Sequence, residues 1–182
     1  RPYEIYSWCD RLERRTTSKF RGIFLETSMD ILRTTKDLDI TKDAVRPHLS
    51  VDFRTSKGRK IFILEEFIDD ESIPMAYCCV AFCYAVPTNE EELEKYSIPD
   101  GKIAVAYTVW ATRHRKGAGR DIIFKIRDRL VEDRERLYGE LPFVDRMITL
   151  SPLTDMAYRF HTKNGATLLN HNETSYNFEY DI

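Results

Sequence analysis

The stretch Trp110-Ala111-Thr112-Arg113-His114-Arg115-Lys116-Gly117-Ala118-Gly119-Arg120 decides the fold of this chain. It follows an apolar run rich in Val, Ala and Tyr and precedes a run with helical apolar spacing. A glycine-containing loop that opens into a helix offers an anion free backbone N–H groups and the positive end of the helix dipole. Gly117 and Gly119 are the positions for a close approach to phosphate. The stretch therefore predicts a pyrophosphate-binding loop.

The spacing of the glycines excludes two common phosphate loops. A Rossmann loop needs G-x-G-x-x-G after a strand, and a P-loop needs G-x-x-x-x-G-K-[ST]. Residues 120–123 supply neither a third glycine nor the Lys-Ser/Thr pair. Residues 114–119 read H-R-K-G-A-G, which fits the shorter pattern [QR]-x-x-G-x-[GA] at its small positions.

This shorter pattern resembles the GNAT N-acetyltransferase superfamily, whose loop holds the pyrophosphate of acetyl-CoA at the start of a long helix. His114 stands where the family usually has Gln or Arg, and Arg113 and Arg115 flank it. The resemblance implies acetyl-CoA or another acyl-CoA as cosubstrate. The residues that it implies for binding are Val109, Ala111, His114, Arg115, Lys116, Gly117, Ala118, Gly119 and Arg120.

The segments around the loop have the expected periods. Residues 102–112 and 146–150 read as strands, and residues 121–138 and 153–163 read as amphipathic helices. A strand, helix and strand in this order require a parallel pair with a right-handed crossover. The apolar stripes expected on the two helices are Ile122, Ile126, Leu130 and Leu137, and then Leu153, Met156, Ala157 and Phe160.

The end of the second helix, Ala157-Tyr158-Arg159-Phe160-His161-Thr162-Lys163-Asn164-Gly165-Ala166, also resembles the family, which often shows A-x-x-[LF]-Y-x-x-x-G-[FA]. His161 replaces the Tyr that commonly protonates the CoA thiolate. An imidazole donates a proton more readily at neutral pH, because its unperturbed pKa is about 6.5 against about 10 for a phenol. In the alternative interpretation, His161 is a partly buried histidine that is hydrogen-bonded to a neighbour.

A second resemblance gives another reaction. Thr149-Leu150-Ser151-Pro152 and Arg159-Phe160-His161-x-x-Asn164-Gly165-Ala166 are similar to pieces of malonyl-CoA decarboxylases, whose catalytic domain has a GNAT fold. That resemblance implies Ser151 and His161 as catalytic residues, because enolate formation needs hydrogen-bond donors and an acid. This chain is less than half the length of those enzymes and has no room for their large helical domain.

The general base for an amine acceptor is less clear from the sequence. Many family members carry a Glu on the strand before the loop, but residues 103–112 contain no acid. Glu65 and Glu66 are the candidates, and strand alternation sends one of them to each face. We take Glu65 as the predicted catalytic base, with a water chain ending at Tyr107 as the alternative.

The remaining segments predict an α/β (α+β) fold with a GNAT-like mixed central sheet of about six strands and helices on both faces. We expect residues 1–182 to form one domain, with a helical portion at 1–45 and a CoA-binding core at 102–169. The helices expected in the first portion are 2–16 and 19–35, and the further strands are 49–55, 59–68, 75–86 and 165–180. Residues 56–58 suit a hairpin turn. Residues 87–101 read as a polar loop whose acidic run, 89–92, is most simply a solvated connector, with attraction of a cationic acceptor as the functional alternative.

Composition limits the partners. With 182 residues, a formal net charge of −2 and a pI near 6.1, the chain gives no reason to expect nucleic acid or an anionic membrane as a partner. The absence of an 18-residue apolar run or a secretory signal pattern predicts a cytoplasmic protein. Cys9, Cys78, Cys79 and Cys83 read as small buried hydrophobes, and no spacing of Cys or His suggests a metal. A homodimer and a monomer both remain open.

The leading functional hypothesis is transfer of an acyl group, most simply acetyl, from CoA to a primary amine by direct attack. The first alternative is decarboxylation of a malonyl-type acyl-CoA. The second alternative is a non-catalytic module that binds CoA or a protein.

Overall fold

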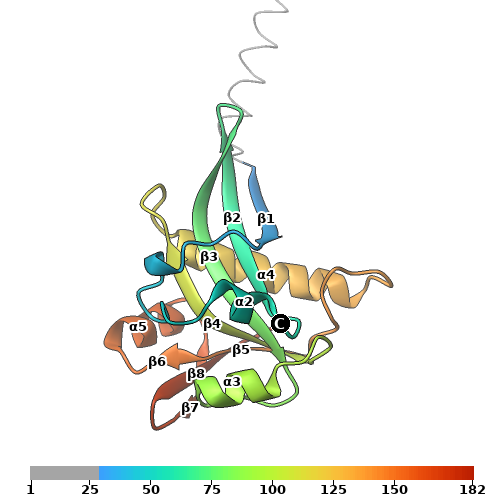
Figure 1. The fold of residues 1–182 in the computed structure, drawn as a ribbon, viewed down its shortest axis with the longest axis vertical. Helices are drawn as coiled ribbons and strands as arrows, with labels where there is room; N and C mark the ends of the chain where they lie inside the picture. The colour runs from blue at the N-terminus through green and yellow to red at the C-terminus, as the bar shows by residue number, and fades with distance from the viewer. Residues whose placement is uncertain (1–28) are drawn as a thin grey trace, which may run out of the picture.

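The structure, a computed structural model, describes residues 29–182, which form one eight-stranded mixed sheet with helices on both faces (Figure 1). The elements are β1 (Asp30–Thr35), η1 (Ile40–Lys42), α2 (Val51–Thr55), β2 (Lys60–Ile68), β3 (Glu71–Cys83), α3 (Glu90–Tyr96), β4 (Ile103–Ala111), α4 (Ala118–Arg134), β5 (Arg146–Thr149), β6 (Ser151–Pro152), α5 (Asp155–Lys163), β7 (Thr167–His171) and β8 (Ser175–Tyr180). The predicted fold class is confirmed, with more strands than expected.

The strand order is β1-β2-β3-β4-β5-β8-β6, and β7 pairs with β8. All neighbouring strands are antiparallel except β4 and β5, which are parallel and are connected through α4. This is the strand-helix-strand unit that the sequence predicts. The parallel pair therefore lies in the middle of the sheet, between two antiparallel halves.

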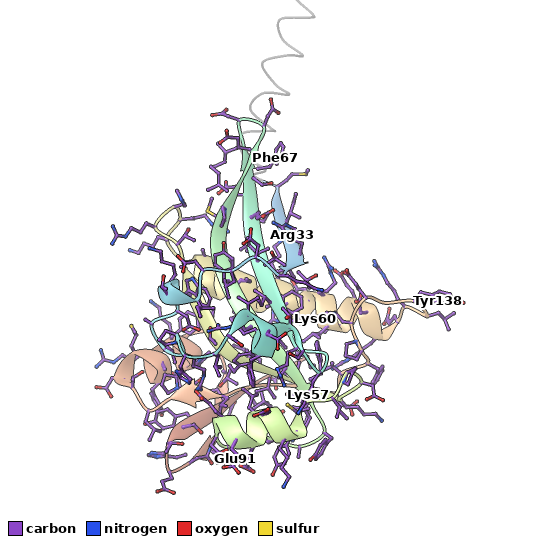
Figure 2. The ribbon with its side chains drawn as sticks, in the orientation of Figure 1. Arg33, Lys57, Lys60, Phe67, Glu91 and Tyr138 are labelled. Atoms are coloured by element: carbon purple, nitrogen blue, oxygen red, sulfur yellow. The ribbon has the colours of Figure 1, made fainter. Side chains whose placement is uncertain are left out.

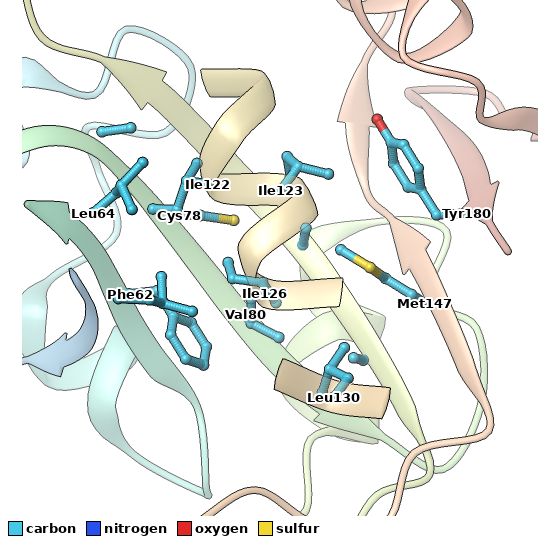
Figure 3. Close-up of a cluster of buried hydrophobic side chains, with 14 of the residues drawn as sticks. Phe62, Leu64, Cys78, Val80, Ile122, Ile123, Ile126, Leu130, Met147 and Tyr180 are labelled. Carbon is cyan, nitrogen blue, oxygen red and sulfur yellow. The ribbon is translucent and has the colours of Figure 1, made fainter. Parts of the chain in front are cut away.

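The sheet separates two apolar layers. On one face, Ile122, Ile123 and Ile126 of α4 are fully buried against side chains of β2 and β3 (Figure 3). On the other face, α2 and α3 cover a second cluster that contains Leu93 and Tyr107. Each fully buried side chain of this size contributes roughly 1.5–3 kcal/mol of transfer free energy. The two layers fix the sheet between its helices, and so fix the ends of β4 and β5.

The β2–β3 hairpin extends beyond the rest of the sheet, and the exposed Phe67 lies near its end (Figure 2). Its turn residues Asp69 and Asp70 both have positive φ, at 50° and 63°. A two-residue turn with positive φ at both positions matches the right-handed twist of the flanking strands. The Asn-Gly pair that usually predicts such a turn is absent, so the sequence does not indicate its position.

Three predictions for the first half are wrong. Residues 49–55 are not a strand, because Ser50 caps α2 by accepting a hydrogen bond from the Phe53 amide at 3.0 Å. Residues 56–58 therefore join α2 to β2 and form no hairpin. Residues 30–35 form β1 where a helix was expected, since alternation buries Leu32 and exposes Ile31. The helix expected at 2–16 lies outside the described residues.

The loop expected at 87–101 contains helix α3. Its N-cap Asn89 accepts a hydrogen bond from the Glu92 amide at 2.8 Å, and three acids stand in its first turn. Acidic residues near a helix N-terminus are stabilised by the helix dipole. The acidic run 89–92, which was expected to lie in a solvated connector, therefore forms the start of a helix.

The two later helices are shorter than predicted. Leu137 lies beyond the end of α4 and is 95% exposed, so it is not part of the apolar stripe. Tyr138 beside it projects from the molecule (Figure 2). Leu153 precedes α5, and Met156 is 78% exposed. The buried residue of α5 is His161. Among the described helices, none combines the length and apolar character of a bilayer span.

Candidate functional site

A gap opens in the sheet where β4 and β5 stop pairing. Their register runs from Ile103 opposite Arg146 to Ala106 opposite Thr149. One further hydrogen bond, from the Leu150 amide to the Ala106 carbonyl, measures 2.9 Å. Beyond it the chain turns into β6, which pairs with β8. The second half of β4 therefore has no strand partner on this edge among residues 29–182.

A bulge in β4 turns the backbone toward this gap. Cys79 and Val80 of β3 lie opposite Thr108 and Ala106, which leaves Tyr107 as the extra residue. Tyr107 offers its carbonyl to the gap side, where it accepts a hydrogen bond from Arg46 Nε at 2.8 Å.

The alternating direction of the backbone groups along β4 determines where two of the expected cofactor-binding residues point. The Thr112 amide donates to the Met75 carbonyl at 2.8 Å, so residue 112 faces β3. Because the direction of backbone groups alternates along a strand, the amides and carbonyls of Val109 and Ala111 face away from β3 and into the gap. They can pair with the amide groups of an extended ligand.

The phosphate-type loop leads from the gap into α4. Its N-cap Gly117 has φ 80°, a conformation that favours glycine, and no side chain caps the helix. The first-turn amides, from Ala118 onward, are therefore open to an anion. A Cβ at Gly119 would lie 3.6 Å from the Phe160 ring, so Gly119 lies where α4 meets α5. His114, Arg113, Lys116 and Arg120 are exposed around the loop.

Arg115 has a different environment from its neighbours. Its guanidinium donates two hydrogen bonds to Asp30, at 2.8 and 2.9 Å, and one to Asp121 at 3.0 Å. Glu66 lies 3.5 Å away. The hydrogen bonds to Asp30 are the main reason that the pKa of Arg115 is raised. Arg115 therefore ties the loop to β1 and β2, beside a hollow of about 370 Å³.

His161 lies on α5 among aromatic side chains and is 4% exposed. Its Nδ1 shares a 2.7 Å hydrogen bond with the Tyr180 hydroxyl, and its ring stacks on Phe178 at 5.1 Å. Burial lowers its pKa to about 4. The imidazole is therefore neutral near pH 7, and its pKa differs from the solvated value expected from the sequence.

The remaining catalytic candidates lie apart. Ser151 Oγ shares a 2.8 Å hydrogen bond with Thr149 Oγ1, and both residues are buried. Within the described part of the chain, no hydrogen bond joins Ser151 to His161. Glu65 is ion-paired with Arg33 at 2.5 Å on β2, and β3 separates it from β4. Tyr107 points its ring into the second apolar cluster.

A polar cluster that the sequence did not predict lies at the start of the gap. Arg46 bridges the two separating strands by donating to the carbonyls of Tyr107 and Leu150, at 2.8 and 3.0 Å. It also donates to Glu90 at 2.5 Å, and His48 lies 2.7 Å from the same carboxylate. Arg46 and His48 carry no motif. The acidic run at 89–92, which includes Glu90, was the part of the sequence that could have indicated this cluster.

Comparison with known proteins identifies the fold. No protein-family model matches the sequence, and no curated protein sequence matches it significantly. Among solved structures, the loading GNATL domain of CurA from Lyngbya majuscula aligns with TM-score 0.55 and 12% identity over 84% of this chain and 98% of that chain. A mutant AtaT toxin bound to the C-terminus of the antitoxin AtaR aligns with TM-score 0.51 and 13% identity over 84% and 92%.

AtaTR bound with AcCoA aligns with TM-score 0.50 and 15% identity over 82% of this chain and 93% of that chain. At such low identity, these likenesses speak to the fold. The described residues have the fold of the GNAT acetyltransferases.

Proposed function

We propose that this protein is an acyl-CoA-dependent N-acyltransferase, which most simply moves an acetyl group to a primary amine. The observation that carries the proposal is the gap between β4 and β5, which continues into the uncapped start of α4. One continuous path thus offers free strand amides and then free helix amides. An acyl thioester with an amide-containing arm and a pyrophosphate has the chemistry to follow this path.

The resemblance to acetyltransferases assigns parts of the ligand to parts of this path. The pyrophosphate would accept hydrogen bonds from the first-turn amides, Ala118 and Gly119, with Lys116 and Arg120 as nearby cations. The amides of the arm would pair with Val109 and Ala111. Arg115 would act indirectly, because its guanidinium holds the loop to Asp30.

The reaction would be a direct displacement. The amine nitrogen attacks the thioester carbonyl carbon, the C–S bond breaks, and the departing thiolate takes a proton. We propose that His161 relays this proton: because burial keeps the imidazole uncharged, a ring nitrogen can accept the proton that the amine nitrogen loses and pass it to the thiolate, which leaves the ring neutral again. The ion pair of Glu65 with Arg33 gives no support to its predicted role as the base.

The test is a calorimetric titration with acetyl-CoA and with malonyl-CoA, followed by mass spectrometry of the acyl-CoA with and without a panel of amines. Release of free CoA that depends on the amine would support N-acyl transfer. Conversion of malonyl-CoA to acetyl-CoA without an amine would assign decarboxylation, with Ser151 and His161 as the residues to test. Binding without turnover would indicate a non-catalytic module, and absence of binding would overturn the proposal.

A further inference from the structure

The cluster formed by Arg46, His48 and Glu90 lies where the gap begins. Arg46 is buried, and its guanidinium contacts the backbone of both separating strands, through the carbonyls of Tyr107 and Leu150. Its remaining arm reaches Oε1 of Glu90 at 2.5 Å. A single guanidinium therefore separates the Glu90 carboxylate from the backbone at the start of the gap.

Glu90 also faces a hollow on this side of the molecule. The hollow has a volume of about 320 Å³, and its lining is mainly polar: Arg46, Asn89, Glu90, Leu150, Thr174 and Ser175. This volume is at the lower end of the range for small-molecule sites, about 300–1,000 Å³. Leu150 belongs both to the hollow and to the start of the gap. A small molecule in the hollow would thus lie next to the separating strands.

The carboxylate of Glu90 is held in place and ionised. His48 Nε2 lies 2.7 Å from Oε2, and Arg46 holds Oε1. Hydrogen bonds from His48 and Arg46 outweigh the effect of burial and lower the pKa of Glu90. Its side chain is still 34% exposed, so lone pairs remain open to the hollow.

We propose that this hollow receives the amine acceptor, and that Glu90 determines specificity by binding the ammonium group of a small polar primary amine. The inference rests on the proposed N-acyl transfer. A fixed carboxylate accepts charge-assisted hydrogen bonds from an ammonium group. Asn89 and Thr174 also line the hollow and give it polar side chains for the rest of a polar molecule. Arg46 and His48 act as positioning residues for the carboxylate.

The first experiment maps binding of putrescine, a linear diamine, by amide NMR shifts in the full chain with free coenzyme A present, so that no acyl group is transferred. We expect shifts at Asn89, Glu90, Leu150 and Ser175. The uncharged diol of the same length should leave these amides unchanged. Shifts elsewhere, or none with putrescine, would overturn the proposal.

The second experiment compares two substitutions on α3. Glu90→Gln removes the charge and should weaken putrescine binding about tenfold or more. Glu91→Gln removes a charge from the next residue, which is exposed on α3 (Figure 2), and should leave the affinity unchanged. Glu90→Asp keeps the charge and should retain part of the affinity if the Gln variant proves unstable. Equal affinities of the two Gln variants would overturn the proposal.

The same variants separate this inference from the proposed function. If acyl transfer to putrescine occurs but Glu90→Gln leaves its KM unchanged, the proposed function stands and the role of Glu90 fails. If putrescine binds in the hollow and Glu90→Gln weakens it, but acetyl-CoA does not bind, the ammonium site stands and the proposed function fails.

Discussion

At the scale of single residues, His161 couples stability to pH. It is 4% exposed, and burial lowers its pKa to about 4, below the value of about 6.5 in an unfolded chain. Between these values the unfolded state binds more protons, so stability rises with pH across this window. The stability that the buried, neutral His161 contributes is fully present above the unfolded pKa and is lost as the pH falls toward the folded pKa. It amounts to about 3 kcal/mol.

We expect His161→Phe to remove most of this dependence. The free energy of unfolding, from urea titrations at about pH 7 and about pH 5, should differ less in the variant than in the wild type. The loss of the bond to Tyr180 lowers stability at both pH values, so the difference between them is the readout. His171→Phe replaces an exposed histidine and should keep the wild-type dependence. An unchanged difference in His161→Phe would contradict the prediction.

A second prediction concerns the buried ion pair of Arg54 and Asp43. Both side chains are at most 2% exposed, and Arg54 also donates to the carbonyls of Leu49 and Arg46. Arg54→Met leaves Asp43 buried without its partner, which costs about 3–5 kcal/mol. The half-exposed pair of Arg146 and Glu179 provides the control, and Arg146→Met should cost about 1 kcal/mol or less. Similar urea midpoints for both variants would refute this difference.

At the scale of elements, the start of α4 can be tested with two matched glycines. Gly117 and Gly165 have φ of 80° and 89°, and a Cβ at either meets no atom within 4 Å. Alanine at either site should therefore lower the free energy of unfolding by a similar amount, about 1–2 kcal/mol, through backbone strain. Only Gly117→Ala lies in the phosphate-type loop, so calorimetry should show a loss of acetyl-CoA affinity in this variant alone. Equal affinity in both variants would argue against the loop as the binding element.

The sequence predicted the elements best where local chemistry and packing agree. Ile122, Ile126 and Leu130 define a helix face, and the glycines before them define its start. The first half was harder to predict, because a Ser50 cap and the Asp69–Asp70 turn decide elements that hydrophobic spacing alone misassigns. Arg46 could not be predicted as part of the site. Its partners come from distant segments, and a single arginine in a loop carries no periodic signal.

At the scale of the whole molecule, a ligand in the gap would join the two antiparallel halves of the sheet. We expect saturating acetyl-CoA to slow amide hydrogen exchange at Val109 and Ala111, because their N–H groups face the gap. Val105, which lies within the fully paired part of β4, should change little. At a ligand concentration of about 100 Kd, global stability should rise by about 2.7 kcal/mol. Unchanged exchange at Val109 and Ala111 with bound ligand would contradict this geometry.

Strand β8 has a consequence for synthesis of the protein on the ribosome. It pairs with β5, β6 and β7, and it is the last described strand along the chain. While the nascent chain lacks residues 175–180, β5 has a neighbour on one side only, and the buried faces of Met147 and Ile148 are uncovered. The β1–β4 meander consists of near neighbours and can fold earlier, since local pairings form fast. One wall of the gap is therefore completed only after β8 has left the ribosome, and a message truncated before Ser175 would encode a chain without a finished site.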